Sequence, residues 1–266
     1  MNSRPTPRPR ARTAAVQLLR LAVLLGATLA VAACTSAPPL PLPAAAAPVA
    51  LHLSTAADPS AAGMLDLREL VPDLALEIRY AGSDNFVGRP VAGYGAPRCY
   101  LLRPVALALQ RVETSLRREG LRLKIFDCYR PARAVADFVA WAGDLDDQVT
   151  KADYYPNLPK RALLGDYISP TSGHSRGATL DLSLMRCASA DDASTCTALD
   201  MGTPFDYFDV SAHTDWPGAT SVQRENRQRL LAAMAREGFA NYPLEWWHYT
   251  YKPEPTPQTA YDFPLR

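Results

Sequence analysis

Two short segments of the sequence concentrate the residues that can bind a metal ion. The first is Ser172-Gly-His174-Ser-Arg-Gly-Ala-Thr-Leu-Asp181, and the second is Glu245-Trp-Trp-His248. The chain has four His residues, and two of them lie in these segments. Two His and one Asp suit a catalytic zinc ion, which takes three protein ligands and keeps one position open for water. We therefore predict that His174, Asp181 and His248 hold one Zn²⁺ ion per chain.

A carboxylate beside this metal would complete the chemistry of hydrolysis. Zinc lowers the pKa of its bound water to about 7, and a neighbouring carboxylate can take the proton and later pass it to a leaving amine. Glu245 stands three residues before His248 and is placed for that role. Either segment alone would be a weak signal, because Asp181 could be a buried structural carboxylate and aromatic runs often fill cores. Their joint presence indicates a hydrolytic zinc site, whereas His52 and His213 are expected to be structural or exposed.

The spacing within each segment constrains the local backbone. Seven residues separate His174 from Asp181, so a regular strand would point the two side chains to opposite faces. Gly177 between them could supply the bend that brings both to one metal ion. Glu245 and His248 are three residues apart, which fits one helical turn or a bulged strand. The surrounding aromatic residues favour the strand.

The apolar pattern predicts the elements that must position these residues. Pro104 begins a helix with apolar residues at three-to-four spacing, and Gly120 ends it. Apolar and basic residues alternate over 121–125, which predicts a strand leading into Asp127-Cys-Tyr-Arg130. Further predicted elements are a helix from Pro131 to about residue 141, a helix over 221–237 closed by Gly238, and a strand over 244–251. Helices and strands without a regular βαβ repeat indicate an α+β domain.

The first 63 residues are excluded from the predicted domain. Residues 1–20 hold five Arg and no acidic residue, and the apolar run that follows has 13 residues, fewer than the roughly 20 needed to span a bilayer. The run ends in Val-Ala-Ala-Cys34, which resembles a bacterial lipoprotein signal with a lipidated Cys34. Simple secretion, a transmembrane anchor and a core helix are the alternatives. We predict an export signal over 1–34, an Ala/Pro-rich tether over 35–63, and one domain over 64–266 in a periplasmic, membrane-anchored lipoprotein.

The net charge and the number of Cys residues indicate which partners and which cellular compartment suit the chain. Without residues 1–34 the chain has 23 basic and 27 acidic residues, a net charge of −4. No basic stripe is expected, which argues against nucleic-acid binding. Four Cys remain after Cys34, an even number that suits an oxidising compartment. Cys187 and Cys196 bracket a polar loop and would pair, leaving Cys99 with Cys128, although the sequence allows all three pairings.

The metal-binding segments closely resemble those of the VanX-type D-alanyl-D-alanine dipeptidases, zinc peptidases related to the D-Ala-D-Ala carboxypeptidases and the hedgehog signalling domain. The likeness covers about residues 65–266. It implies a single α+β domain with a central, mainly antiparallel sheet flanked by helices. Other segments match in family order: Ile78-Arg-Tyr80-Ala, Asp84-Asn-Phe-Val-Gly88, Asp127-Cys-Tyr-Arg-Pro131, Tyr154-Tyr-Pro-Asn157, Met201-Gly-Thr-Pro-Phe-Asp206 and Asp262-Phe-Pro264.

The resemblance also implies roles for individual residues. It matches the zinc ligands and the base already named. Arg130 matches an arginine that stabilises the oxyanion formed at the peptide carbonyl, a role that suits a permanently charged guanidinium. Without the resemblance we would assign Arg130 to a surface salt bridge. Asp206 and Ser172 match groups that bind the free amino group of the substrate, and Tyr80 lines the same pocket.

The implied activity is hydrolysis of D-alanyl-D-alanine to two D-alanines, in cell-wall peptide turnover or recycling. An export signal conflicts with the cytoplasmic role of family members tied to glycopeptide resistance. The rivals are a zinc D,D- or L,D-carboxypeptidase that trims peptidoglycan stem peptides, and a non-catalytic zinc- or wall-binding lipoprotein. A disulfide between Cys99 and Cys128 would lie two residues from Arg130 and could brace it. The sequence gives no indication of oligomeric state.

Overall fold

The computed structural model describes residues 51–189 and 192–266. The predicted export signal, the lipid site at Cys34 and the predicted tether up to residue 50 lie outside the described residues. From residue 51 on, the end of the predicted tether contains β1 (His52–Leu53), which pairs in parallel with β10 (Thr259–Ala260). Within the described ranges, none of the helices has the length and apolar character that crossing a membrane requires.

A six-stranded sheet lies at the centre of the described part of the chain. Besides β1 and β10, the described strands are β2 (Met64–Asp66), β3 (Ala75–Leu76), β4 (Tyr100–Leu102), β5 (Leu121–Asp127), β6 (Thr179–Cys187), β7 (Cys196–Ala198), β8 (Phe239–Asn241) and β9 (His248–Tyr251). Strands β2 and β4 pair only with each other, and the other six form the central sheet. The order in the sheet is β3-β5-β6-β9-β8, and β7 pairs with the end of β6. All neighbours are antiparallel except β3 and β5. The predicted α+β class with a mainly antiparallel sheet is confirmed.

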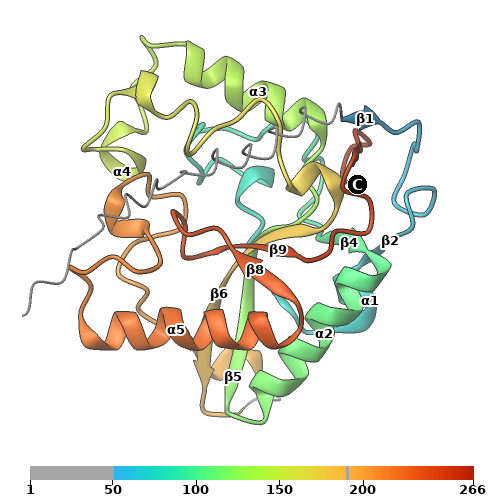
Figure 1. Ribbon diagram of the computed structural model, residues 1–266, viewed down its shortest axis with the longest axis vertical. Coiled ribbons are helices and arrows are strands. Elements are labelled where there is room, and N and C mark those ends of the chain that lie inside the picture. The colour runs from blue at the N-terminus through green and yellow to red at the C-terminus, as the bar shows by residue number, and fades with distance from the viewer. Residues whose placement is uncertain (1–50, 190–191) are drawn as a thin grey trace, which may run out of the picture. The chain divides into compact units, whose positions relative to one another are not determined.

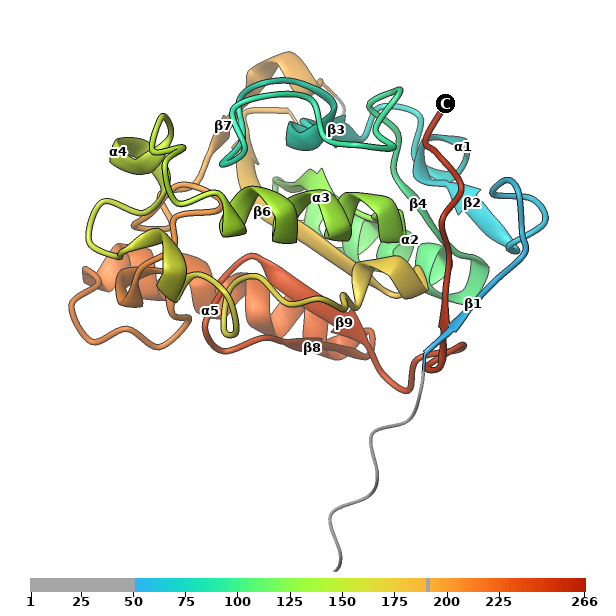
Figure 2. The ribbon, with the colours of Figure 1, turned by 90° about the horizontal axis from the view of Figure 1, so that it is seen from above.

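Helices cover the sheet from two sides. The α-helices are α1 (Leu67–Leu70), α2 (Arg103–Arg117), α3 (Ala132–Gly143), α4 (Lys151–Tyr154) and α5 (Ser221–Arg236). The 3-10 helices are η1 (Arg79–Ala81), η2 (Lys160–Ala162), η3 (His174–Arg176), η4 (Ala193–Thr195) and η5 (Val210–Ala212). Helices α2 and α5 pack against each other and against β5, β6 and β8, and α3 lies on the other side of β6 and β9 (Figure 1, Figure 2).

Local sequence explains where the long helices begin. Pro104 occupies the first turn of α2, where its missing N–H removes no helical hydrogen bond. Thr220 and Gln223 form a reciprocal capping box at the start of α5. Both helices were predicted from the sequence; α2 ends at Arg117, before the predicted end at Gly120, and α5 ends at Arg236, one residue before the predicted end. The apolar side of α2 is fully buried, which fixes the helix on the sheet.

The strand predicted over 244–251 is wrong in its first half. Only His248–Tyr251 is extended, as β9. The preceding residues turn, because the Glu245 N–H donates to the Tyr242 carbonyl (3.0 Å) and the His248 N–H donates to the Glu245 carbonyl (3.3 Å). The two tryptophans between Glu245 and His248 are buried in the core instead of alternating between faces.

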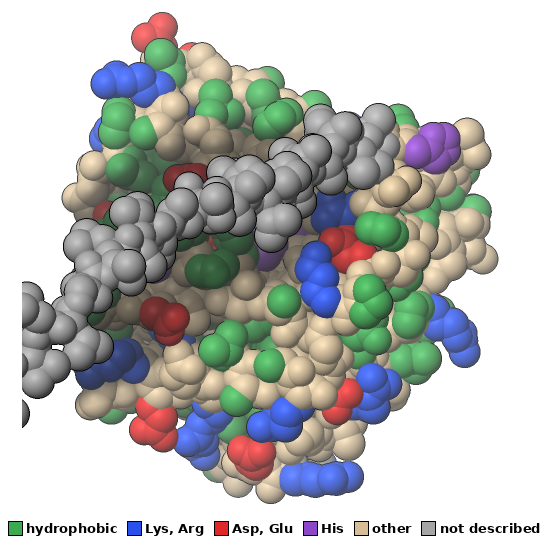
Figure 3. Space-filling view, in the orientation of Figure 1, with side chains coloured by type: hydrophobic (Ala, Val, Ile, Leu, Met, Phe, Trp, Pro, Cys, Tyr) green, Lys and Arg blue, Asp and Glu red, His purple; other side chains and the backbone are tan. Residues whose placement is uncertain are grey.

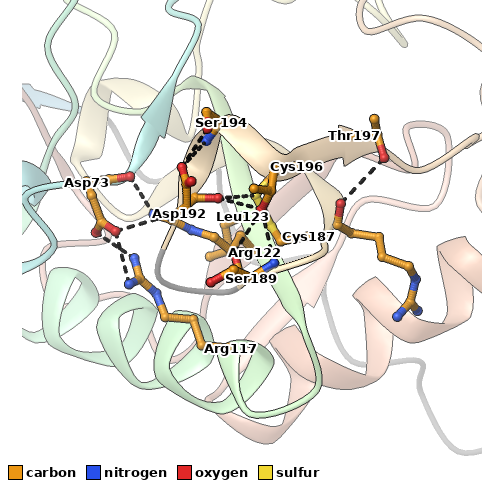
Figure 4. Close-up of a disulfide and its surroundings, with 12 residues drawn as sticks. Asp73, Arg117, Arg122, Leu123, Cys187, Ser189, Asp192, Ser194, Cys196 and Thr197 are labelled. Atoms are coloured by element: carbon orange, nitrogen blue, oxygen red, sulfur yellow. Dashed lines mark hydrogen bonds and ion pairs between the residues drawn. A yellow bond between two sulfur atoms is a disulfide. The ribbon is translucent and has the colours of Figure 1, made fainter.

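Both expected disulfides are formed. Cys99–Cys128 joins the segment before β4 to the residue after β5. Cys187–Cys196 joins β6 to β7 across directly paired positions. Figure 4 shows this second bridge near a cluster in which Asp73 accepts hydrogen bonds from Arg117. Cys187 is the last residue of β6, whereas Asp181 lies near the start of that strand. Cys128 of the other bridge lies two residues before Arg130 in the sequence.

Candidate active site

Strand register places three polar side chains in one row across the sheet. Asp127 on β5 pairs directly with Asp181 on β6, and Asp181 pairs directly with His248 on β9. Directly opposed residues on neighbouring strands point to the same face and lie close together. The row therefore gathers two carboxylates and an imidazole from segments that are far apart in the sequence.

A β-bulge at Phe126 brings Asp127 into this row. Ile125 pairs with Leu182 and Asp127 pairs with Asp181, so β5 has one more residue than β6 between these pairs. Without the bulge, Asp127 would share a face with Ile125. The extra residue turns Asp127 to the face of Asp181, as bulges near active sites commonly do.

Gly177 brings His174 to the same face. His174 lies in η3, and Gly177 ends that helix with φ 70° and ψ 19°, a left-handed conformation that favours glycine. A Cβ at this position would meet Met64 Cε at 2.5 Å. The bend expected from the sequence is therefore present, and the chain enters β6 immediately after it.

The three predicted ligands have the spacing of a tetrahedral metal site. The His174 Nε2 atom lies 3.4 Å from His248 Nδ1 and 3.4 Å from Asp181 Oδ2. The distance from His248 Nδ1 to Asp181 Oδ1 is 3.1 Å. Two ligands about 2.1 Å from a zinc ion at the tetrahedral angle would be about 3.4 Å apart. Among the described residues, buried Asp181 Oδ1 has no hydrogen-bond donor, so the three side chains fit a zinc ion.

Neighbouring groups orient the ligands. The His174 Nδ1–H donates to the Cys128 carbonyl oxygen at 2.8 Å, which leaves Nε2 to face the metal position. Asp127 Oδ2 lies 3.4 Å from the same Nδ1. Burial lowers the pKa of His248 despite the nearby Asp181, so its imidazole is held neutral, as a metal ligand must be. The pKa of Asp181 is also lowered, because the two His outweigh the effect of its burial.

Glu245 lies beside the three ligands. Its Oε2 is 3.5 Å from His248 Nδ1, and its side chain is largely buried. Burial raises the pKa of Glu245 well above its ordinary value, and the negative charges of Asp181 and Asp206 raise it further. A carboxyl group with a raised pKa suits proton exchange near neutral pH.

Arg130 is held between an acid and two aromatic rings. Its Nε donates to Asp127 Oδ2 at 2.9 Å, and its Nη2 lies 3.5 Å from Asp181 Oδ2. The guanidinium carbon lies 5.2 Å from the ring centre of Tyr80 and 4.9 Å from that of Phe138. These contacts fix a positive charge at the edge of the predicted metal position. Arg130 therefore does not form the surface salt bridge that we would expect without the family resemblance.

Asp206 is a buried carboxylate opposite Tyr80. The Tyr80 hydroxyl donates to Asp206 Oδ2 at 2.9 Å. Burial raises the pKa of Asp206 well above its ordinary value, and the charge of Asp181 adds to that shift. Asp206 also has φ 60°, an uncommon conformation for a residue other than glycine. Among the described residues no Lys, Arg or His forms a salt bridge with Asp206, so this buried carboxylate would gain much from a cation arriving in the cavity.

These side chains surround a cavity of about 210 Å³. Seven of the eight predicted catalytic, metal-binding and substrate-binding residues line it, and the eighth, His174, is a buried predicted ligand outside the lining. Ser172 lines the wall and accepts a hydrogen bond from the His174 N–H at 3.2 Å. Phe86 and Phe208 close other parts of the wall. In Figure 3, recessed hydrophobic and acidic side chains are visible on this face of the molecule.

Two residues that support the site were not predicted from the sequence. Asp127 is fully buried and contacts both Arg130 and His174, and Tyr94 donates to Asp127 Oδ1 at 2.7 Å. Asp127 lies in one of the segments that resemble the family. Regular strand alternation, however, would place its side chain on the face of the sheet opposite to the predicted metal ligands. His52 is exposed on β1 and does not line the cavity, as expected.

Comparison with known proteins gives consistent matches. A family model described as D-ala-D-ala dipeptidase matches residues 60–266. A D-alanyl-D-alanine dipeptidase of Streptomyces coelicolor is 39% identical over 74% of this chain and 95% of its own length. Proteins of the same name from Enterococcus faecium and Enterococcus faecalis are 36% and 37% identical over 77% and 76% of this chain, and over 98% and 97% of their own lengths.

Proposed function

Because the chain belongs to the D-Ala-D-Ala dipeptidase family, we propose that it hydrolyses D-alanyl-D-alanine to two molecules of D-alanine with one zinc ion. The observation that carries this proposal is the tetrahedral spacing of His174, Asp181 and His248 beside Glu245 in one small cavity. When bound, zinc supplies a Lewis acid that polarises a carbonyl oxygen and lowers the pKa of water to about 7.

Glu245 moves the proton in this scheme. Its carboxylate takes a proton from the water that attacks the peptide carbonyl carbon, and it passes that proton to the nitrogen as the C–N bond breaks. The raised pKa of Glu245 supports both halves of the exchange, since the group must first accept and then release a proton. A cation at the three ligands would offset the charge of Asp181, while the burial of Glu245 would remain.

Arg130 stabilises the negative charge that develops on the carbonyl oxygen. Its guanidinium is already fixed by Asp127, so little reorganisation is needed as the charge develops. The contacts with the rings of Tyr80 and Phe138 restrict the orientation of the guanidinium plane, so its remaining N–H groups point in a fixed direction.

Asp206 receives the free amino group of the dipeptide, with Tyr80 and Ser172 beside it. A substrate ammonium would lower the raised pKa of Asp206 and pair with its carboxylate. The cavity of about 210 Å³ is smaller than the ~300–1,000 Å³ of sites for drug-sized ligands, which favours a dipeptide over a longer stem peptide.

We place this activity outside the cytoplasmic membrane. The support is the lipoprotein-like pattern of residues 1–34, which would attach the enzyme to a membrane through a lipid on Cys34. There the enzyme would meet dipeptides released during cell-wall turnover. Radiolabelled palmitate offered to the producing cell should label the wild-type chain and leave a Cys34→Ala variant unlabelled; equal labelling of both would contradict the lipid site.

The activity is tested with purified residues 35–266 and added zinc. D-Ala-D-Ala and a stem pentapeptide ending in D-Ala-D-Ala are offered separately, and free D-alanine is measured. We expect kcat/KM for the dipeptide to exceed that for the pentapeptide by about 100-fold or more, because the penultimate D-Ala of the pentapeptide has an amide nitrogen where the dipeptide has the ammonium that pairs with Asp206. Comparable release from the pentapeptide would instead indicate a carboxypeptidase, and zinc binding without release from either would indicate a non-catalytic protein.

A further inference from the structure

Arg227 on α5 is a fully buried cation whose hydrogen bonds all go to one loop. Its Nε donates to the Met201 carbonyl oxygen at 2.7 Å, its Nη1 to that of His213 at 2.6 Å, and its Nη2 to that of Ser211 at 2.9 Å. A guanidinium holds its donors in a rigid planar fork, so it can keep several acceptors at fixed relative positions. Arg227 therefore fixes both ends of the 201–213 loop relative to α5.

Asp206 lies between these anchored ends. Met201 precedes it in the loop, and Ser211 and His213 follow it. The loop backbone lies directly on the guanidinium, because a Cβ built on Gly202 would meet Arg227 Nη2 at 2.9 Å. The hydrogen bonds of Arg227 thus close the loop on both sides of the residue that we assign to the substrate amine.

The backbone of Asp206 requires such support. Its φ of 60° is sparsely populated by residues other than glycine, and such conformations persist when the surrounding structure determines them. Neighbouring side chains contribute to that determination, since Phe205 stacks on Phe126 with ring centres 4.7 Å apart. The conformation directs the Asp206 carboxylate to the Tyr80 hydroxyl and into the cavity.

We propose that Arg227 is a positioning residue for substrate recognition, which holds the 201–213 loop in the conformation that presents Asp206 to the ammonium of the dipeptide. This inference rests on the proposed function. Lys at position 227 would keep the positive charge but would lack the planar fork that reaches three carbonyl oxygens. Asp206 would then lose the constraint on its backbone, and its carboxylate would no longer be held opposite Tyr80.

The test compares two substrates of similar size that differ in the amino group. D-Ala-D-Ala carries the ammonium, and D-lactoyl-D-alanine carries a hydroxyl in its place. We expect wild-type enzyme to prefer the amine substrate, and Arg227→Lys to reduce this preference in kcat/KM by roughly 10- to 100-fold. The change should come mainly from KM, because amine binding holds the substrate before and during the reaction. A merely structural role would lower kcat/KM for both substrates equally.

Arg229→Lys is the matched control, since it makes the same change on the same helix at a residue that pairs only with Glu225 in the described part of the chain. It should leave the preference unchanged. If wild-type enzyme shows no preference for the amine, the proposed role of Asp206 fails. If the wild type shows the preference and Arg227→Lys keeps it in full, the inference about Arg227 is overturned.

Gly202→Ala keeps the test decisive if Arg227→Lys does not fold, and a double variant adds a second check if it does. Gly202→Ala pushes the loop away from the guanidinium from the opposite side and should also reduce the preference. In an Asp206→Asn background, Arg227→Lys should reduce the preference no further, because the two residues act through one carboxylate. Independent, multiplicative losses in the double variant, or an unaltered preference in Gly202→Ala, would contradict the inference.

Discussion

At the scale of single residues, burial gives the side chains of the cavity unusual protonation behaviour. Glu245 and Asp206 have raised pKa values because they are buried and lie near the charge of Asp181. His248 has a lowered pKa for the same reason of burial. These opposite shifts keep the carboxyl groups near proton exchange and the imidazole neutral, which is the combination that metal-assisted hydrolysis requires.

Replacing Glu245 separates proton transfer from metal binding. We expect Glu245→Gln to reduce kcat by about 10²- to 10⁴-fold, the usual contribution of a general base, while the protein keeps its zinc. Turnover of D-Ala-D-Ala and zinc content by atomic absorption are the two measurements. A variant that loses zinc together with activity would assign Glu245 to the metal instead.

Replacing Asp127 tests the support of the ligands. Asp127→Asn keeps the size of the side chain but removes the charge beside Arg130 and His174. We expect zinc affinity to fall by about 10- to 100-fold, as for other residues that orient a metal ligand. Competition with a chelator measures the affinity. An unchanged affinity with reduced kcat would show that Asp127 acts only through Arg130.

Residue types and spacing predicted the three metal ligands and the base, and the family resemblance added Arg130, Ser172, Asp206 and Tyr80, but neither indicated the role of Asp127. The ligands and the base were predicted because His, Asp and Glu at these spacings suit zinc chemistry. Asp127 is the last residue of β5, where regular alternation would place it on the face of Ile125, and the bulge that turns it to the other face depends on pairing with β6. A β-bulge is defined by the register against a partner strand, so the alternation of residues within one segment cannot predict the bulge.

At the scale of elements, the turn at Gly177 connects η3 to β6 and sets the distance between His174 and Asp181. We expect Gly177→Ala to destabilise the protein by about 1–2 kcal/mol from the left-handed backbone alone, with a further loss from the clash with Met64. Urea unfolding measures the stability, and zinc affinity should fall as well. Gly143→Ala at the end of α3 is the control, because a Cβ there meets no atom within 4 Å in the described part of the chain.

The two disulfides should differ in their effect on the metal. Cys128 supplies the carbonyl that orients His174, so removing the Cys99–Cys128 bridge should weaken zinc binding as well as stability. Removing the Cys187–Cys196 bridge should reduce stability only. Each loss of stability is expected near 2–4 kcal/mol. Paired Cys→Ala variants are compared by thermal unfolding and zinc titration, and equal zinc affinity in both would remove the first bridge from the metal site.

At the scale of the whole molecule, the paired order of the strands could not be predicted from local patterns. The helices α2 and α5 follow from apolar spacing and caps, which lie within one segment. In contrast, β6 pairs with β5 and β9 across long stretches of chain, and this pairing creates the row of Asp127, Asp181 and His248. The α+β class was predictable because it depends on element types, whereas the site depends on their arrangement.

The pKa shifts also predict how the stability of metal-free protein depends on pH. Asp206 and Glu245 bind protons more tightly in the folded state than in the unfolded state, whose ordinary values are 3.8 and 4.5. Above these values the unfolded state loses protons first, so these two groups make the free energy of unfolding fall as pH rises, whereas the lowered pKa of His248 opposes this fall below its ordinary value of 6.5. Urea unfolding of metal-free protein from pH 5 to pH 8 measures this slope. Glu245→Gln should make the slope shallower, and an unchanged slope would contradict the raised pKa of Glu245.

The short pairing of β1 with β10 has a mechanical consequence. Backbone hydrogen bonds that include those from the His52 N–H to the Gln258 carbonyl (2.7 Å) and from the Ser54 N–H to the Ala260 carbonyl (2.8 Å) hold this edge. If the chain is tethered through its N-terminal side, as we propose, tension reaches this short pairing before it reaches the central sheet. Rupture of this pairing would lengthen the chain on that side of the domain, so the tension would be released without distorting β6 and β9, which carry Asp181 and His248.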